Sequence, residues 1–428
     1  MNPKSRLSLL LALSIAGIGI TDAQWQRRDF MPTPRYGFCT AVLNDSVFVI
    51  GGAHGMQAVR TDIDSTVEAY DPRTGNWNAQ LRPLSGPRVF AVAVVVEGRI
   101  FVFGGMEVVT SRNSGYLSSV EMFDPGVRRW FPRSPMPTPR AKLAAAVVNG
   151  KVLLIGGEDS SGPLDVVEEY DPDHDAWNTH VDHLRQRRTG FSAFTIDDDI
   201  YVVGGIGGPW NPTPLRSMEK FDSHTNLRKW EMVSSLNLKW ARAFYGGVVT
   251  DKAIVILGGE GADGFLFTAE VFSIKDAKPL ASSMYFLPFV RSMFGCVLVR
   301  DRLYVFGGLT IGMYAQQLAP SIDELDLVTG INAAHPEIPA SAALYQNYPN
   351  PFNPATTITY DIPAASDAPV VMEVFSVLGD RVALIQNLPR EPGRHSIVFD
   401  AGRLPSGTYL YKLTRGKESI SRRMALVK

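Results

Sequence analysis

The chain has few of the features that mark a disulfide scaffold, a nucleic-acid-binding protein or a membrane-embedded protein. Its 428 residues include only two cysteines, Cys39 and Cys296, which cannot build a disulfide framework. It has 42 Lys and Arg against 43 Asp and Glu. No basic excess is therefore available to neutralise phosphates, and no nucleic-acid partner is expected. Apolar residues make up 45% of the chain, so a hydrophobic core can supply its stability.

Long hydrophobic runs are also scarce, with one exception near the start. A positive segment with Lys4 and Arg6 precedes the apolar run Leu7–Ile20, and small residues follow it. The run is too short for a comfortable membrane span. We predict that residues 1–23 are a cleaved signal peptide; an uncleaved anchor is the alternative. No transmembrane segment is expected in the mature chain.

Recognised catalytic and metal-binding patterns are missing. There is no Gly-x-Ser-x-Gly nucleophile motif and no His-Glu-x-x-His zinc motif, and the seven histidines are scattered. We therefore predict no catalytic residue, no metal site and no cofactor from motifs.

What the chain does contain is an internal repeat. Six glycine pairs recur about every fifty residues, each at the end of a β-rich run such as "VFVIGG" or "IFVFGG". Two apolar runs joined by a short polar turn precede each pair, which predicts a β-hairpin of fixed register. The first strand of each hairpin has small central residues, as expected for the innermost strand of a propeller blade. An arginine lies sixteen residues before the first glycine of every pair: Arg35, Arg88, Arg140, Arg188, Arg242 and Arg291.

A second signature follows each glycine pair in the first four copies, as in "EAYDPRTGNW". It predicts a third strand, a turn at Asp-Pro, and an outer strand whose tryptophan packs between blades. The sixth copy ends at "ELDLVTG" without an outer strand, whereas the unassigned segment "QWQRRDFMPTPR", with Trp25, precedes the first copy. We predict that this N-terminal segment completes the sixth blade and closes the ring.

The glycine pairs, the Tyr/Phe-Asp motif and the spaced tryptophans resemble kelch repeats. This resemblance implies that residues 24–330 form a six-bladed kelch β-propeller of four-stranded blades. The protein is thus expected to be all-β.

The repeat is followed by an Ala- and Pro-rich linker at 331–343, and then by short β runs that predict a small immunoglobulin-like β-sandwich at 344–428. The segments "YPNPFNP", "VFSVLGDRV" and "LPSGTYLYKL" closely resemble the C-terminal sorting domain of the type IX secretion system of Gram-negative bacteria. An accessory ligand-binding sandwich is the alternative. The motif residues are Tyr348, Pro349, Asn350, Pro351, Phe352, Asn353, Pro354, Gly379, Gly407 and Tyr409. The resemblance implies recognition by outer-membrane secretion machinery, and a secreted or cell-surface protein.

Pseudo-symmetry should bring the six arginines to one face of the propeller, around its axis. Their planar guanidinium groups suit an anionic or polyhydroxylated ligand. The alternative is structural, because each arginine could instead pair with the backbone or with the acidic residue of the third strand. Further ligand-binding candidates on this face are His54, Trp210 and Trp240.

Two functions follow from these features. The leading hypothesis is a secreted or surface-displayed propeller that binds an unidentified protein or glycan. The alternative is a sugar-processing enzyme, similar to kelch sialic-acid epimerases or mutarotases, that would use the arginine-lined opening of the propeller.

Overall fold

A computed structural model describes residues 25–427 except 56–61, 111–112, 209–212, 225–227, 251–252, 263, 267, 274–277, 312–315, 327–341, 348–349, 364–369, 386–392 and 417. The described residues form strands and no helix, as predicted. Within this part of the chain there is accordingly no apolar helix of membrane-spanning length. The chain divides into two compact units. The first holds the described residues between 25 and 326, and the second holds those between 342 and 427.

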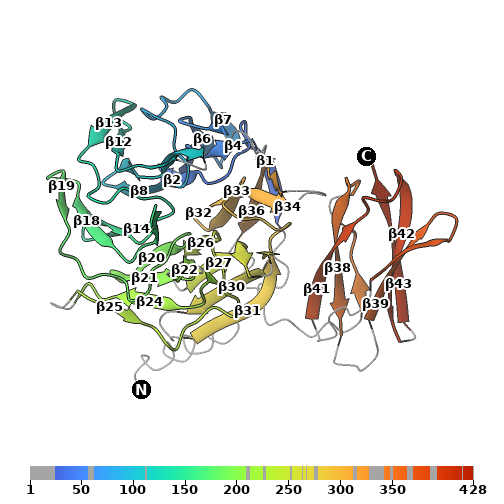
Figure 1. Ribbon diagram of the computed structural model, residues 1–428. Helices are drawn as coiled ribbons and strands as arrows, with labels where there is room; N and C mark the ends of the chain where they lie inside the picture. The colour runs from blue at the N-terminus through green and yellow to red at the C-terminus, as the bar shows by residue number, and fades with distance from the viewer. Residues whose placement is uncertain are drawn as a thin grey trace, which may run out of the picture. The chain divides into compact units, whose positions relative to one another are not determined.

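The first unit is a six-bladed propeller (Figure 1), as the repeat predicted. Its described strands form six antiparallel four-stranded sheets, and each sheet starts at the axis with the strand that follows an arginine. Blades 1 to 3 run outwards as β2 (Cys39–Leu43), β3 (Ser46–Ile50), β6 (Val67–Asp71) and β7 (Asn76–Asn78); β8 (Val92–Val96), β9 (Arg99–Phe103), β12 (Val120–Asp124) and β13 (Arg129–Arg133); and β14 (Ala144–Val148), β15 (Lys151–Ile155), β18 (Val167–Asp171) and β19 (Ala176–Asn178). Blades 4 to 6 run outwards as β20 (Ser192–Ile196), β21 (Asp199–Val203), β24 (Met218–Phe221) and β25 (Trp230–Met232); β26 (Gly246–Val249), β27 (Ala253–Leu257), β30 (Thr268–Ser273) and β31 (Lys278–Phe286); and β32 (Gly295–Val299), β33 (Arg302–Phe306), β36 (Ser321–Asp326) and β1 (Gln26–Phe30).

The N-terminal strand closes the ring, which confirms the prediction for the segment around Trp25. Strand β1 pairs antiparallel with β36 as the outermost strand of blade 6, with Gln26 opposite Glu324. Arg28 also donates two hydrogen bonds, of 2.6 and 2.7 Å, to the Glu324 carboxylate. At the axis the innermost strands contact one another in order, and β32 contacts β2.

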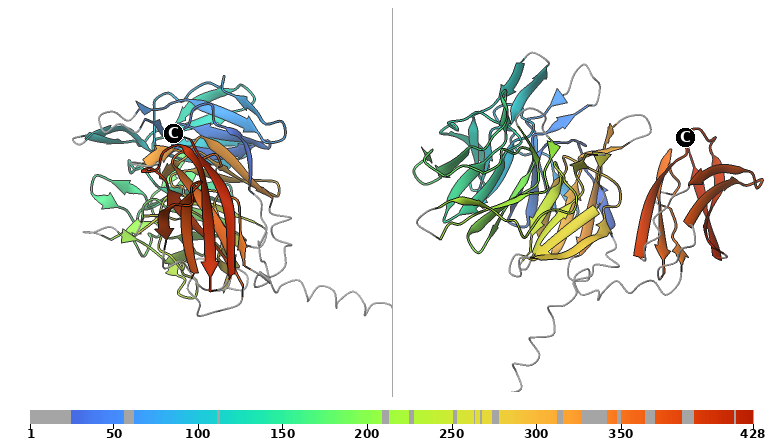
Figure 2. Two further views of the ribbon diagram at one scale, coloured as in Figure 1. Left: turned by 90° about the vertical axis from the view of Figure 1, so that its right-hand side faces the viewer. Right: turned by 60° about the horizontal axis from the view of Figure 1, so that its bottom comes forward.

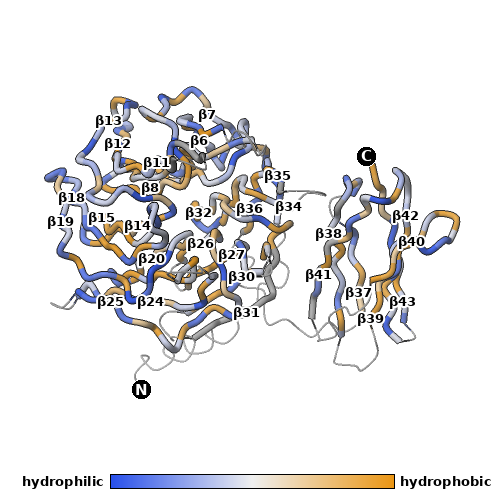
Figure 3. Tube along the Cα trace, viewed as in Figure 1, coloured by the Kyte–Doolittle hydropathy of each residue, from blue (hydrophilic) through white to orange (hydrophobic). Residues whose placement is uncertain are grey.

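The blades pack through the residues that the repeat singled out. Trp77 of blade 1 packs against Tyr70 of its own blade and Phe306 of blade 6, with ring centroids 5.2 and 6.3 Å apart. Trp177 of blade 3 likewise reaches Phe103 of blade 2 at 6.1 Å. The tryptophans thus wedge neighbouring blades together, as predicted. Hydrophobic residues gather along the strands of both units (Figure 3).

A two-stranded hairpin follows each glycine pair and lies at the arginine end of its blade. The residue after the pair forms a β-bridge with the residue after the arginine, as in Ala53 with Tyr36. The six hairpins share this attachment but differ in length and sequence. They are β4 (Ala53–His54) with β5 (Asp62–Ile63), β10 (Met106–Thr110) with β11 (Asn113–Tyr116), β16 (Glu158–Asp159) with β17 (Gly162–Pro163), β22 (Ile206–Gly207) with β23 (Thr213–Pro214), β28 (Glu260–Gly261) with β29 (Gly264–Phe265), and β34 (Leu309–Ile311) with β35 (Gln316–Leu318).

The second unit is a β-sandwich of two antiparallel sheets (Figure 2). Side chains from both sheets, including Tyr360, Met372 and Tyr411, share one buried core. The predicted start of this domain at Leu344 falls within its first strand. The sheets are β37 (Ala343–Leu344), β38 (Ala355–Ile362) and β41 (Gly393–Asp400), and β40 (Arg381–Ile385), β39 (Val370–Ser376), β42 (Gly407–Arg415) and β43 (Glu418–Leu426).

Candidate ligand-binding site at the arginine end of the propeller axis

The six repeated arginines lie inside the blades, where they are at most 2% exposed. Each forms an ion pair with the acidic residue of the third strand of its own blade. Arg88 Nη2 lies 2.6 Å from Glu121 Oε1, and Arg188 Nη2 lies 2.6 Å from Glu219 Oε1. The other four pairs are Arg35–Glu68, Arg140–Glu168, Arg242–Glu270 and Arg291–Asp323.

The same arginines explain the constant spacing to the glycine pairs. In five blades Nη1 donates to the carbonyl of the first glycine, as Arg188 does to Gly204 at 2.7 Å. The second glycine in turn donates its N–H to the backbone carbonyl of the next blade's arginine, as Gly52 does to Arg88 at 2.8 Å. Gly51 has a φ of +64°, and a Cβ there would lie 2.5 Å from the Arg88 carbonyl oxygen. Glycine is therefore required where adjacent blades meet.

Burial governs the electrostatics of these pairs. Desolvation lowers the pKa of Arg140 to about 10 despite the opposing charge of Glu168. It also lowers the pKa values of Arg88, Arg242 and Arg291. Because every guanidinium group is already paired with a carboxylate, a ligand at the axis meets no free arginine charge. The structural alternative for the arginines accounts for all these contacts. Their proposed role as ligand-binding residues would require the pairs to open.

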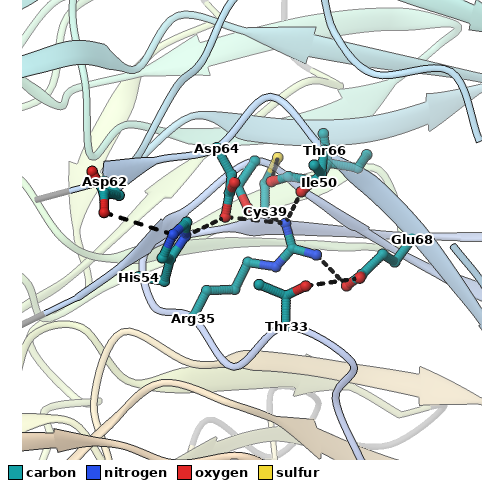
Figure 4. A network of polar contacts seen from close by, with 10 residues as sticks. Thr33, Arg35, Cys39, Ile50, His54, Asp62, Asp64, Thr66 and Glu68 are labelled. Carbon is teal, nitrogen blue, oxygen red and sulfur yellow. Dashed lines mark hydrogen bonds and ion pairs between the residues drawn. The ribbon is translucent and has the colours of Figure 1, made fainter.

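His54 belongs to an extension of this network in blade 1 (Figure 4). Its Nδ1 lies 2.8 Å from Asp64 Oδ2, and that same oxygen lies 3.8 Å from Arg35 Nη1. The imidazole is 40% exposed, with Nε2 3.9 Å from Asp62 Oδ2. Asp64 therefore orients the ring and leaves its other edge near solvent. His54 remains a ligand-binding candidate.

Trp240 lies in the segment that leads to Arg242, and it is partly exposed. Lys239 Nζ lies 4.4 Å from the centroid of its indole ring. The third candidate, Trp210, falls outside the described residues. Trp240 belongs to blade 5, and His54 belongs to the hairpin of blade 1.

The structure also reveals a feature that sequence reasoning missed. The residues two positions after the arginines surround the axis and form a closed ring of backbone hydrogen bonds of 2.6 to 3.0 Å, in which each N–H donates to the carbonyl of the preceding blade. All six have φ between +52° and +64°. We call this ring the collar, and it consists of Gly37, Phe90, Lys142, Gly190, Phe244 and Met293.

The larger side chains of the collar meet across the axis. The Phe90 and Phe244 rings, from blades 2 and 5, have centroids 6.3 Å apart. Lys142 Nζ lies 5.2 Å from the Phe90 centroid and 5.7 Å from the Phe244 centroid. Collar residues, among them Lys142 and Met293, line a cavity of about 120 Å³. A second pocket, of about 420 Å³, is lined by residues of the innermost strands of blades 2 to 5, including small ones such as Ala145 and Gly247.

Acidic residues of the hairpins flank the collar. Glu158 Oε1 accepts from Lys142 Nζ at 2.6 Å, and Glu158 Oε2 accepts from Thr189 Oγ1 at 3.2 Å. Glu260, at the equivalent position in blade 5, accepts from Ser292 Oγ at 2.5 Å. Variation at the second position after each arginine was the one sequence signal for this site, because that position holds Gly, Phe, Lys or Met on an otherwise constant frame.

The two cysteines are separate free thiols at the inner strands. Burial raises the pKa of each to about 12, which disfavours the reactive thiolate form. The two thiols are therefore not joined by a disulfide.

The described residues of the "YPNPFNP" segment attach it to the sandwich through one buried aromatic side chain and several hydrogen bonds. Phe352 is 2% exposed in the core, and its N–H donates to the Ala425 carbonyl at 2.9 Å. Asn350 Oδ1 accepts from the Ala425 N–H at 2.8 Å. The carbonyl of Pro354 accepts from the Ala401 N–H, whereas Pro351 and Asn353 are exposed. This segment therefore caps the end of β43.

The two glycines and the last tyrosine of the motif also lie at positions where they support the fold of the sandwich. Gly379, with a φ of +91°, lies in the turn between β39 and β40, and Gly407 begins β42. Tyr409 is 4% exposed and donates its hydroxyl to the Pro405 carbonyl at 2.7 Å. Tyr348 and Pro349 lie outside the described residues.

Comparison with known proteins agrees with both parts of the fold. The family model of the KLHDC2/KLHL20/DRC7 Kelch-repeats domain matches residues 18–205, and that of the Kelch motif matches residues 187–237. Kelch-like protein 25 of Xenopus tropicalis is 28% identical over 217 residues, which cover 50% of this chain and 35% of that protein. Kelch-like protein 26 of Danio rerio is 26% identical over 287 residues, covering 66% and 45%. Beta-scruin of Limulus polyphemus is 27% identical over 211 residues, covering 48% and 22%. The chain thus spans less than half the length of these relatives.

The fold and its internal arginine–carboxylate frame define a kelch-type β-propeller. The family model of the secretion system C-terminal sorting domain matches residues 346–427. The protein is therefore a kelch-repeat propeller that carries a secretion sorting domain. Such a domain interacts with secretion machinery, and it places the protein among bacterial proteins that are secreted or held at the cell surface.

Proposed function

We propose that the propeller is a recognition module that binds a protein or glycan partner at the arginine end of its axis. The observation that carries this proposal is the contrast between the constant arginine–carboxylate pairs inside the blades and the varied residues at the collar and hairpins. All six blades repeat the same arginine–carboxylate pair, whereas the collar residues and the hairpins differ from blade to blade. A constant frame that presents varied side chains is the usual design of a binding surface on a rigid scaffold.

Delivery is the second part of the proposal. The predicted signal peptide, residues 1–23, would lead the chain out of the cytoplasm, and the sorting domain would then direct it through a type IX system to the outer surface of a Gram-negative bacterium. The match of residues 346–427 to a sorting domain supports this route. The signal peptide itself lies outside the described residues.

The sugar-processing alternative receives no such support. It would use the arginine-lined opening of the propeller, but the guanidinium groups are buried and paired with carboxylates. Recognition without turnover is therefore the function that the geometry favours.

The test is a binding screen of the purified full chain against glycan and peptide arrays. The doubly substituted Lys142→Met/Glu158→Gln variant removes an ion pair at the collar. The matched Arg300→Met/Asp45→Asn variant removes an exposed pair, 2.7 Å long, at the turns of the inner hairpins. We expect binding to be lost only in the collar variant. Binding that survives there but disappears in the matched variant would contradict the proposal.

A further inference from the structure

The collar is a preorganised surface. Its six residues are linked by a closed ring of hydrogen bonds, and each is in the left-handed backbone region, which non-glycine residues adopt only when the surrounding structure requires it. The aromatic rings of Phe90 and Phe244 therefore have fixed attachment points. A ligand that binds there contacts two aromatic rings that the fold already holds in place, so little conformational entropy is lost in ordering them on binding.

The charges around the collar favour a ligand without net negative charge. Lys142 is paired with Glu158 at 2.6 Å. Glu260 adds a second carboxylate, which accepts a hydrogen bond from the neutral Ser292 hydroxyl. The six buried arginines are balanced by six carboxylates. An anionic ligand at the collar would therefore meet Lys142 already paired with Glu158, and it would be repelled by Glu260.

The hydrogen-bonding groups around the collar further restrict the class of ligand that fits there. Glu158 and Glu260 are acceptors, Lys142 is a donor, and the Ser292 and Thr189 hydroxyls can serve as both. An extended peptide brings a carbonyl acceptor with nearly every N–H, and a carboxylate facing those carbonyls is unfavourable. A sugar hydroxyl can rotate to donate to a carboxylate or to accept from an amine. The apolar face of a pyranose ring can also pack on a phenyl ring.

From these groups we infer that the collar binds a neutral saccharide, which packs on Phe90 and Phe244 and hydrogen-bonds with Glu260, Glu158 and Lys142. This inference rests on the proposed recognition function and specifies its ligand class. A polypeptide ligand at the same surface is the competing outcome.

The experiment titrates the full chain with three probe sets: neutral oligosaccharides, their sialylated counterparts, and peptides. We expect a neutral oligosaccharide to bind, with a Kd that changes little between about 50 and about 500 mM NaCl, because no net charge is neutralised. Phe244→Ala should weaken binding about tenfold through lost ring packing. Glu260→Gln should weaken it about tenfold or more through a lost charged hydrogen bond.

Two matched variants control for general effects. Phe131→Ala removes a phenyl ring, 38% exposed, from the outer strand of blade 2, and Glu97→Gln neutralises an exposed residue in a hairpin turn at the opposite end. Both should bind the saccharide like the parent chain, and unchanged thermal unfolding of all four variants would show that they fold.

The outcomes test the saccharide inference and the recognition function separately. If only peptides or sialylated glycans bind and Phe244→Ala abolishes that binding, the saccharide inference is wrong and the recognition function stands. Saccharide binding that is equal in Phe244→Ala and Phe131→Ala also overturns the inference. If every bound probe is unaffected by all the collar substitutions, the proposed recognition surface fails as well.

Discussion

Arg188 Nη2 lies 2.6 Å from Glu219 Oε1, and neither side chain has any exposed surface. Arg187, the preceding residue, lies 3.6 Å from Asp165 with its side chain 52% exposed. Two neighbouring arginines thus make one buried and one solvent-screened ion pair. Removing one partner of a buried pair leaves an uncompensated charge, whereas exposed pairs contribute little.

We therefore predict that Arg188→Ala lowers the free energy of unfolding by about 3–5 kcal/mol. Arg187→Ala should lower it by less than about 1 kcal/mol. Chemical denaturation of the full chain, followed by tryptophan fluorescence, measures both. Equal losses in the two variants would show that the frame does not depend on the buried pair.

The arginine frame could be predicted from sequence because it repeats. Six arginines share one spacing and each has an acidic residue in the third strand of its own blade, so the sequence leaves few possible partners and allows pairing within the blade. Ring closure through β1 was predictable for a similar reason. The sixth copy lacked an outer strand, and the residues around Trp25 had no blade of their own.

The collar could not be found in this way. Nothing in Phe90, Lys142, Phe244 or Met293 favours a positive φ, a conformation that sequence patterns assign to glycine. Tertiary geometry imposes it, because each residue must donate its N–H to the preceding blade. The ion pair between Lys142 and Glu158 likewise depends on the β-bridge between Ala141 and Glu158, which no local pattern encodes.

A pH-dependent contribution is expected from the closure of blade 6. Burial acts to raise the pKa of Glu324, but hydrogen bonds from Arg28 and Tyr304 outweigh it and hold that pKa below its ordinary value of 4.5. The folded state therefore binds this proton less readily than the unfolded chain does. The stabilisation is present above pH 4.5 and is lost as the pH falls through the lower folded value.

Glu324→Gln should accordingly destabilise the protein at pH 7, and the difference from the parent chain should shrink as the pH falls below 4.5. Urea denaturation at a series of pH values measures this difference, with the exposed Glu97→Gln variant as control. A difference that stays constant or grows on acidification would contradict the role assigned to Glu324.

The cysteines should react slowly or not at all in the folded protein. Because burial raises the pKa of Cys39 and Cys296 to about 12, neither supplies a reactive thiolate at pH 8. We predict that a thiol reagent does not label the buried Cys39 of the native protein and labels the partly exposed Cys296 only slowly. Both thiols should react once guanidinium chloride unfolds the chain. Rapid labelling of the native protein would show that the thiols are accessible, and labelling that fails even after unfolding would reveal a disulfide.

The sorting motif should act through the fold of the sandwich. Phe352→Ala creates a cavity in a core where Phe352 is 2% exposed, and we expect a loss of about 3–5 kcal/mol in the stability of that unit. Asn353→Ala, one residue away and exposed, should have little effect.

Delivery to the medium or cell surface should fall with Phe352→Ala and stop when residues 344–428 are deleted. Asn353→Ala should be delivered normally if the motif's main role is to hold β43. Quantitative immunoblotting of cell fractions tests this, and normal delivery of the deleted chain would refute the sorting role.

The central structural claim is that the chain closes its ring with its own N-terminal strand, since the collar surrounds one axis only in a closed ring. Hydrogen exchange followed by mass spectrometry of the full chain tests this claim directly. The account predicts that the hydrogen-bonded amides of Gln26–Phe30 exchange at least about a hundredfold more slowly than in a free peptide, together with those of Ser321–Asp326. Exchange of Gln26–Phe30 at the free-peptide rate would contradict it.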